Sequence, residues 1–361
     1  MSNPLEKIKK NSTIKETSII SKSSVYGKKD MTKTEVPMIN VALSASMDGG
    51  ISPGLTMIAG PSKHFKSMFA LLIASAYLKQ HDDAVLLFYD NEFGTPEGYF
   101  DTFNIDMERV VHTPITDIEE LKHDLVTQLH LLEKKDKVFI IIDSVGNLAS
   151  KKETDDALSG SDKADMTRAK QFKSLWRMVT PYLATKDIPL IAVNHTYKTI
   201  EMYSKDQVSG GTGGIYSSNT IWIVGRQQEK KPGKELLGYN FMIKVEKSRF
   251  VREGAKIPIT VLFDKGIVKW SGMFELAKEA GYIVSPSRGW YNGVNPETGE
   301  VLTENKREAD IVDSDEFWNM MIEKTNIKAF IKDVYSIGGG KFDLFNDDDG
   351  EEIVVTGDND E

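Results

Sequence analysis

An octapeptide near residue 60 has the residue types of a nucleotide-binding phosphate loop, with one departure. It is Gly60-Pro61-Ser62-Lys63-His64-Phe65-Lys66-Ser67, whereas the pattern G-x-x-x-x-G-K-[ST] has glycine in place of Phe65. In such a loop backbone N–H groups bind phosphate, the lysine adds charge for the β- and γ-phosphates, and the serine hydroxyl binds Mg²⁺. Phe65 can serve if its ring turns into the core while its N–H faces the phosphate. The alternative is an incidental turn between a strand and a helix.

Two acidic residues stand where apolar runs end. Glu92 follows the run that ends at Asp90, and it could activate a water molecule for attack on a γ-phosphate. A helix cap or a solvated rim would explain Glu92 equally well. Asp143 ends the fully apolar run 138–142, the Walker-B pattern, in which the carboxylate supports the Mg²⁺ that Ser67 also contacts.

A third polar group follows another apolar run. His195 ends this run, and the glycine-rich stretch 209–214 follows further along the chain, so His195 could sense the γ-phosphate and report it to that stretch. The alternatives are a histidine satisfied by its own neighbours and a disordered glycine linker. Flexible glycines also suit single-stranded DNA, because exposed backbone N–H groups reach phosphates. The face formed by Arg168, Lys170, Lys173 and Arg177 is either a DNA contact or a solvated helix surface.

The elements that must position these groups alternate along the chain. We predict buried strands at 56–59, 84–90, 137–143 and 188–194, with helices behind the octapeptide, at 118–132 and at 166–183. Such alternation indicates an α/β fold with a parallel sheet. Successive strands at 220–224, 239–245 and 257–263 should extend the sheet in antiparallel fashion. Beyond them we expect a helix at 273–282 and a loop-like segment at 286–299.

Composition limits the protein class. The chain has no cysteine, which excludes disulfides, thiolate catalysis and Cys-based zinc sites, and no apolar run approaches membrane-span length. We therefore expect a soluble, intracellular protein that does not bind membranes. The net charge is −9, but nine acidic residues lie in 342–361, and residues 1–33 hold eight lysines against three acids.

These charged ends suggest a division into four parts. We predict a basic arm at 1–35, an ATPase core at 36–270, a small segment at 271–341 and an acidic tail at 342–361. Disordered, solvated ends are the simpler interpretation. The other is that the arm touches DNA phosphates and the tail competes with DNA for the same groove.

The order of these motifs resembles that of the RecA-type recombinases and, within that family, the UvsX branch of T-even-like phages. The resemblance covers roughly residues 35 to 335. It rests on residues 36–44 (VPMINVALS), 59–67 (AGPSKHFKS), 143–154 (DSVGNLASKKET), 165–170 (DMTRAK) and 245–249 (VEKSR). The phage branch is similar at Phe65, whereas bacterial RecA has glycine.

The resemblance implies roles for individual residues. Lys66 and Ser67 would bind ATP and Mg²⁺, Glu92 would polarise water, and Asp143 would support the metal. His195 stands where bacterial RecA has a phosphate-sensing glutamine. Tyr99 would stack on adenine, and Lys247 and Arg249 would reach the ATP of a neighbouring subunit. The implied DNA contacts lie in 151–168 and 196–214 or nearby: Lys151, Lys152, Arg168, Lys170, Arg177, Gly210, Gly211, Thr212 and Gly213.

By the same resemblance, the function would be that of an ATP-dependent recombinase in the cytoplasm of an infected bacterium. It would form helical filaments on single-stranded DNA, exchange strands with double-stranded DNA, and act with a mediator and a single-stranded-DNA-binding protein. Two rivals share the motifs: a ring-forming helicase, and an accessory protein that binds DNA without hydrolysing ATP.

Overall fold

The computed structural model describes residues 3–14, 16–23, 25, 29–160, 167–198, 206–230 and 236–340. The predicted acidic tail and parts of both predicted DNA-binding loops, 161–166 and 199–205, lie outside these described residues. Within the described part of the chain, no helix is long and apolar enough to cross a membrane.

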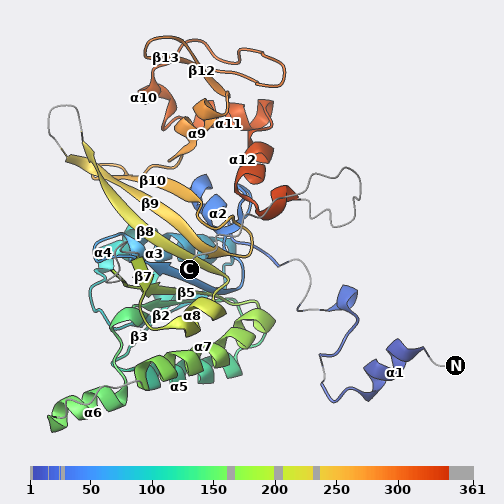
Figure 1. Ribbon diagram of the computed structural model, residues 1–361, viewed down its shortest axis with the longest axis vertical. Helices are drawn as coiled ribbons and strands as arrows, with labels where there is room; N and C mark the ends of the chain where they lie inside the picture. Colours follow the sequence, from blue (N-terminus) through green and yellow to red (C-terminus); the bar gives the residue numbers. More distant parts are fainter. Residues whose placement is uncertain are drawn as a thin grey trace, which may run out of the picture.

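A nine-stranded sheet forms the centre of the molecule (Figure 1). Its strand order is β11-β10-β9-β8-β1-β5-β4-β2-β3. Pairing is parallel from β8 through β3 and antiparallel from β8 through β11. The strands are β1 (Gly54–Ala59), β2 (Val85–Asp90), β3 (Val110–Pro114), β4 (Val138–Asp143), β5 (Pro189–Asn194), β8 (Thr220–Lys230), β9 (Leu236–Ser248), β10 (Lys256–Leu262) and β11 (Gly266–Ile267).

This topology confirms the predicted α/β fold with a mostly parallel sheet and an antiparallel extension. The predicted strands are all present, and those at 220–224 and 239–245 are longer than expected. Edge strand β3 was missed, because three of its five residues are exposed and its sequence lacks a continuous apolar run.

Alternate side chains of the central strands enter two separate hydrophobic cores, as the period-two geometry of a strand requires. In β4, Phe139 and Ile141 join the core that contains α3 (Lys66–Gln80), whereas Ile140 and Ile142 join the core that contains α5 (Ile118–Leu131) and α7 (Thr167–Lys186). Helices therefore cover both faces of the sheet, which explains the nearly continuous apolar runs.

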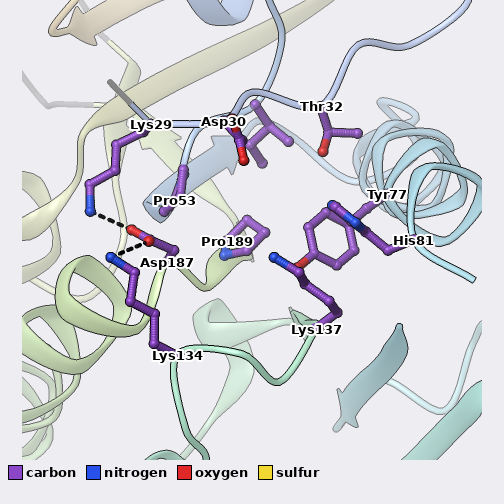
Figure 2. A pocket seen from close by; sticks show the side chains of 11 residues that line it. Lys29, Asp30, Thr32, Pro53, Tyr77, His81, Lys134, Lys137, Asp187 and Pro189 are labelled. Carbon is purple, nitrogen blue, oxygen red and sulfur yellow. Dashed lines mark hydrogen bonds and ion pairs between the residues drawn. The ribbon is translucent and has the colours of Figure 1, made fainter. Parts of the chain in front are cut away.

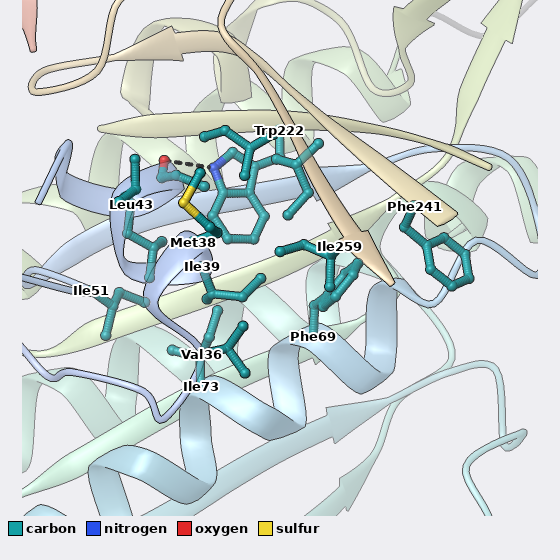
Figure 3. Packing of buried hydrophobic residues seen from close by; sticks show 14 of the residues in the cluster. Val36, Met38, Ile39, Leu43, Ile51, Phe69, Ile73, Trp222, Phe241 and Ile259 are labelled. Carbon is teal, nitrogen blue, oxygen red and sulfur yellow. Dashed lines mark hydrogen bonds between the residues drawn. The ribbon is translucent and has the colours of Figure 1, made fainter. Parts of the chain in front are cut away.

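The first core extends beneath the antiparallel strands (Figure 3). There the indole of Trp222 donates a hydrogen bond to the carbonyl oxygen of Ala42, 3.1 Å away, which satisfies its buried N–H.

The helices of the described chain are α1 (Pro4–Asn11), α2 (Pro37–Ser44), α3 (Lys66–Gln80), α4 (Glu97–Thr102), α5 (Ile118–Leu131), α6 (Lys151–Ser159), α7 (Thr167–Lys186), α8 (Thr212–Ser217), α9 (Met273–Glu279), α10 (Glu308–Ile311), α11 (Asp315–Lys324) and α12 (Ile327–Tyr335). Short 3₁₀ turns lie at η1 (Ile20–Lys22), η2 (Met107–Arg109), η3 (Val145–Asn147) and η4 (Ile337–Gly340).

The C-terminal elements lie at one end of the molecule, at the top of Figure 1. The expected loop-like character of 286–299 is wrong in part, because β12 (Ile283–Ser287) and β13 (Trp290–Gly293) form an antiparallel hairpin there. Buried residues of α9 and α11, such as Phe274 and Trp318, belong to the first core. A further small hairpin pairs β6 (Thr196–Lys198) with β7 (Asp206–Val208).

Within the described part of the basic arm, residues 29–32 contact the core. Helix α1 buries none of its residues and lies apart from the sheet (Figure 1). Further along, Thr32 forms an antiparallel bridge with Ile51. Figure 2 shows that Lys29 and Lys134 approach the Asp187 carboxylate from two sides, and both form ion pairs with it. The arm is therefore anchored where β5 begins.

Candidate nucleotide-binding site

The octapeptide connects β1 to α3, in the strand–loop–helix context that the pattern requires. Lys63 and Phe65 both have positive φ, at 61° and 62°. The second of these is the position at which the pattern has glycine, the residue that adopts this conformation without steric cost. The first N–H groups of α3 receive no cap from the Phe65 side chain, whereas Asp117 caps α5 and Ser150 caps α6. Uncapped N–H groups suit an anion.

The ring of Phe65 packs into the first core, away from the loop. It stacks on Phe241 of β9 with centroids 5.1 Å apart and meets the edge of Phe69 at 5.3 Å. Arg226 of β8 supports the same loop, because its guanidinium donates to the carbonyl oxygen of Lys63 at 3.0 Å. Aromatic packing thus holds a non-glycine residue in a conformation that glycine adopts freely.

Lys66 and Asp143 are charged groups buried side by side. Lys66 is 6% exposed, and its ammonium donates to the carbonyl oxygen of Pro61 at 2.8 Å. Burial lowers the Lys66 pKa, while the charges of Glu92 and Asp143 act in the opposite direction. Burial raises the pKa of Asp143 to about 6, although a hydrogen bond from Ser67 lowers it.

The carboxylate of Asp143 fits a magnesium site. Its Oδ1 atom is buried and has no hydrogen-bond partner in the described structure, and Ser67 binds the same carboxylate. The described residues contain no cluster of three or more His, Cys, Asp or Glu side chains suited to a metal. Magnesium that is held by one or two protein oxygens together with phosphates and water needs no such cluster. The residues present therefore suit Mg²⁺ bound together with a nucleotide.

Glu92 accepts three hydrogen bonds at a single oxygen. Ser144 Oγ (2.7 Å), His195 Nε2 (2.9 Å) and Asn147 Nδ2 (3.1 Å) all donate to Oε1. The hydrogen bond from His195, the hydrogen bond from Ser144 and the charge of Lys66 together outweigh burial and lower the Glu92 pKa to about 2. With Oε1 occupied in this way, Oε2 is the oxygen that can bind a water molecule.

The backbone that carries Glu92 is fixed by its neighbours in sequence. Asp90 Oδ1 accepts from the N–H groups of Glu92 (3.0 Å) and Phe93 (2.9 Å). Asn91 Oδ1 accepts from Ser144 N at 2.7 Å. Sequence reasoning missed Asp90, Asn91, Ser144 and Asn147 as functional residues. The available signal was the clustering of polar residues directly after β2 and β4.

His195 lies directly after β5, and Gly146 makes room for its ring. A Cβ atom at Gly146 would lie 2.6 Å from His195 Cδ2, closer than such atoms approach in proteins. His195 also lies 3.4 Å from Ser144 Oγ and starts the segment that leads into β6. The structure therefore brings Lys66, Glu92, Asp143 and His195 together at the carboxyl edge of the sheet.

The predicted DNA-binding cations do not share one environment. Lys151, Lys170 and Arg177 are exposed, and Lys152, also exposed, pairs with Asp156 on α6. Arg168 instead donates Nε to the carbonyl oxygen of Leu148 at 2.7 Å and Nη2 to that of Gly146. Arg168 is thus engaged with the protein backbone.

The second half of the glycine-rich stretch is helical. Gly213 and Gly214 lie in α8, which packs closely on α7: a Cβ at Gly213 would lie 2.8 Å from Lys173 Cα. Gly210 and Gly211 precede the helix with φ of 92° and 78°, and Thr212 begins it. The interpretation as a disordered glycine linker is therefore wrong for 212–214, because these residues lie in α8 and its close packing on α7 requires glycine at 213.

Three predicted nucleotide contacts lie apart from the octapeptide in sequence. Lys247 donates to the carbonyl oxygens of Ile215 and Tyr216, at 2.7 and 3.2 Å, near the C-terminus of α8. Burial and the nearby Arg249 lower the Lys247 pKa. Arg249 is exposed, and Tyr99 lies on α4 with 38% of its surface exposed.

The fold and the site together define a class: an α/β nucleotide-binding protein with a phosphate loop, a Walker-B carboxylate and an ordered glutamate. Comparison with protein families is consistent with this class. Residues 3–268 match the RecA N-terminal domain, and residues 270–333 match the family described as Bacteriophage T4, Recombination and repair protein, C-terminal domain.

Two relatives found by sequence point the same way. The chain is 46% identical to the Recombination and repair protein of Enterobacteria phage T4, over 94% of this chain and 87% of that protein. It is 23% identical to Protein RecA of Cutibacterium acnes, over 73% and 75% of the two chains. A solved structure of the RadB recombinase matches with a TM-score of 0.46 and 18% identity, covering 63% of this chain and 95% of that one. The chain belongs to the RecA family of recombinases.

Proposed function

We propose that this chain is an ATP-dependent recombinase that forms helical filaments on single-stranded DNA and catalyses homologous pairing and strand exchange. The observation that carries the proposal is the meeting of Lys66, Glu92 and Asp143 at one edge of the sheet in a member of the RecA family. Homology to the T4 recombination and repair protein supports the recombinase assignment.

ATP is proposed to bind along the octapeptide, with Lys66 at the β- and γ-phosphates. Ser67 and Asp143 would hold Mg²⁺, which would supply positive charge that favours phosphoryl transfer. Tyr99 is proposed to contact the adenine.

Glu92 is proposed to orient the attacking water through Oε2. A carboxylate whose pKa is about 2 is a weak base at neutral pH. In the arrangement described, Glu92 therefore positions water more than it removes a proton. Loss of the His195 hydrogen bond would raise the Glu92 pKa and strengthen it as a base, which makes His195 the proposed link between nucleotide state and the segment after β5.

The filament supplies the second half of the site in this proposal. Lys247 and Arg249 would reach the ATP of a neighbouring subunit, in the manner of arginine fingers. Lys247 would have to leave the carbonyl oxygens of α8 to do so, so nucleotide binding at the interface would act on α8. The basic arm is proposed to contact the adjoining subunit.

DNA is proposed to bind along α6, α7 and the start of α8. The contacts proposed are Lys151, Lys152, Lys170, Arg177, Gly210, Gly211, Thr212 and Gly213. Double-stranded DNA would enter as the exchange partner, and a mediator and a single-stranded-DNA-binding protein would act with the filament in the cytoplasm of an infected bacterium.

Imaging with single-stranded DNA and a slowly hydrolysed ATP analogue tests the proposal. Helical filaments are expected, and rings would favour the helicase. ATP hydrolysis is then measured with and without single-stranded DNA. Equal rates would refute coupling between DNA and hydrolysis, and an absence of hydrolysis would favour the accessory protein.

Removal of the acidic tail tests its proposed competition with DNA. A chain that ends at Lys341 should bind duplex DNA more tightly than the full chain at equal salt, because nine acidic residues are lost. Unchanged affinity would refute the competition.

A further inference from the structure

Arg168 holds the turn that holds Glu92. Its guanidinium donates to the carbonyl oxygens of Gly146 and Leu148, and its carbon CZ lies 5.4 Å from the centre of the Phe172 ring. A planar guanidinium presents several N–H donors in a fixed fork, so it can bind two carbonyl oxygens of one turn at once.

The residues of that turn surround the Glu92 carboxylate. Ser144, directly before η3, and Asn147, at its end, both donate to Glu92 Oε1, at 2.7 and 3.1 Å. Gly146, whose carbonyl oxygen Arg168 binds, is also the residue against which the His195 ring packs. A shift of the turn would therefore change all three hydrogen bonds that Glu92 accepts.

Arg168 joins this turn to a helix that packs in the second core. It is the second residue of α7, whose side chains Phe172, Leu175, Trp176 and Val179 are buried in the second core. The same helix presents Lys170 and Arg177 to solvent, where DNA is proposed to bind. A displacement at the start of α7 would reach the turn through one side chain.

We propose that Arg168 is a positioning residue for Glu92, which transmits the placement of α7 to the ATPase site. This inference rests on the proposed function, because it presumes that Glu92 takes part in ATP hydrolysis. It assigns Arg168 a role distinct from that of a DNA phosphate contact. The two roles predict different effects of substitution on kcat and on DNA affinity.

Two substitutions in the full-length chain separate the roles. Arg168→Lys keeps the charge that a phosphate contact needs but loses the fork, and Arg168→Gln loses both. We measure the ATPase kcat and KM at saturating single-stranded DNA. We also measure DNA affinity at several salt concentrations with a slowly hydrolysed ATP analogue. Lys170→Gln on the same helix is the matched control.

For a positioning residue, Arg168→Gln should lower kcat at least tenfold, and Arg168→Lys should lower it several-fold. The KM for ATP, the DNA affinity and its salt dependence should stay unchanged in both. Lys170→Gln should instead weaken DNA binding and reduce its salt slope by about 1, as a phosphate contact does.

A double-mutant cycle with Asn147→Ala tests whether Arg168 acts through the turn. If it does, the double variant should lose less activity than the product of the two single losses. If each substitution instead damaged the fold independently, the two losses of activity would multiply.

Two results would overturn the inference. One is an Arg168→Gln variant with normal kcat at saturating DNA and weakened, less salt-dependent DNA binding. The other is an Arg168→Lys variant with normal kcat, which decides the matter even if Arg168→Gln does not fold. Wild-type protein is measured first: a lack of DNA-stimulated hydrolysis there would refute the proposed function and not the role of Arg168.

Discussion

Charged residues at the two edges of the parallel sheet differ in how completely they are paired. At the carboxyl edge, Lys66 is buried and its ammonium donates to a backbone carbonyl, and among the described residues one oxygen of Asp143 has no hydrogen-bond partner. At the amino edge, where β5 begins, Asp187 is paired with both Lys29 and Lys134 (Figure 2). Both carboxylates lie next to strands of the same sheet.

This difference in pairing distinguishes a ligand-binding role at the carboxyl edge from an anchoring role at the amino edge. A buried charge that lacks a full set of partners costs stability, because it has lost its hydration without full compensation. Such groups persist where a ligand completes them, as Mg²⁺ and ATP are proposed to do at the carboxyl edge. At the amino edge the ion pairs are already complete, and they tie the arm to the core.

The largest effect should come from removing the charge of the ordered glutamate. Glu92→Gln should lower the ATPase rate by about 10²-fold, because a neutral amide no longer orients the attacking water as the carboxylate does. Binding of the ATP analogue should persist, since the octapeptide is untouched. Steady-state hydrolysis and analogue binding check both points, and an unchanged rate would show that Glu92 is not catalytic.

Displacing His195 should have the next largest effect. In Gly146→Ala the new Cβ would push the ring away from Glu92. We expect an ATPase rate about tenfold lower, because the lost hydrogen bond leaves the carboxylate less well placed to orient water, and this outweighs its gain in basicity. The Glu92 pKa, which the His195 bond lowers most, should rise from about 2 toward 4.5. A smaller fraction would then be ionised near pH 4, so the acid limb of the rate profile should move to higher pH.

A control for this substitution lies on α4. Gly98 has no atom within 4 Å of its would-be Cβ, so Gly98→Ala should leave rate and pH profile unchanged. If Gly146→Ala also leaves both unchanged, the ring does not need the space that Gly146 provides.

Replacing the unusual phenylalanine should affect stability more than activity. Phe65→Gly relieves a positive φ but loses ring packing on Phe69 and Phe241. We expect a net loss of about 1–2 kcal/mol in the free energy of unfolding and an ATPase rate near that of the wild type. Phe93 also has positive φ and is 63% exposed, so Phe93→Gly should not destabilise the fold. A lost ATPase activity in Phe65→Gly would give the ring a role in catalysis.

The smallest effect should come from the amino edge. Asp187→Asn should cost about 1 kcal/mol or less, because these ion pairs are partly exposed, and it should speed proteolysis of the arm. Although burial raises the Asp187 pKa, the bonds from Lys134 and Lys29 lower it overall. The stabilisation is therefore present above the ordinary pKa of 3.8 and lost as pH falls through the lower folded value. Proteolysis of both proteins at pH 7 checks the anchor, and equal rates would contradict it.

Several features of the site followed from the sequence alone. Apolar runs that end in Asp90, Asp143 and Asn194 predicted parallel strands, and parallel strands bring their carboxyl ends to one edge. The meeting of the octapeptide, Glu92, Asp143 and His195 is a consequence of that rule. The pattern of the octapeptide indicated phosphate binding in the same way, since its strand and helix are neighbours in the chain.

Other features depended on contacts between distant segments. Arg168 has the sequence context of a DNA contact, yet its guanidinium binds the turn after β4. The glycines of α8 suggested a flexible loop, yet they allow close packing on α7.

By itself, the sequence determined the order of the motifs along the chain and the family they resemble. It also determined the edge of the sheet at which the chemistry lies, because local periodicity and strand ends encode that edge. Only the tertiary structure decided the Phe65–Phe241 stack, the three donors at Glu92 and the attachment of Arg168. The physical reason is that these are short-range contacts between side chains and backbone from separate elements, which no local pattern relates.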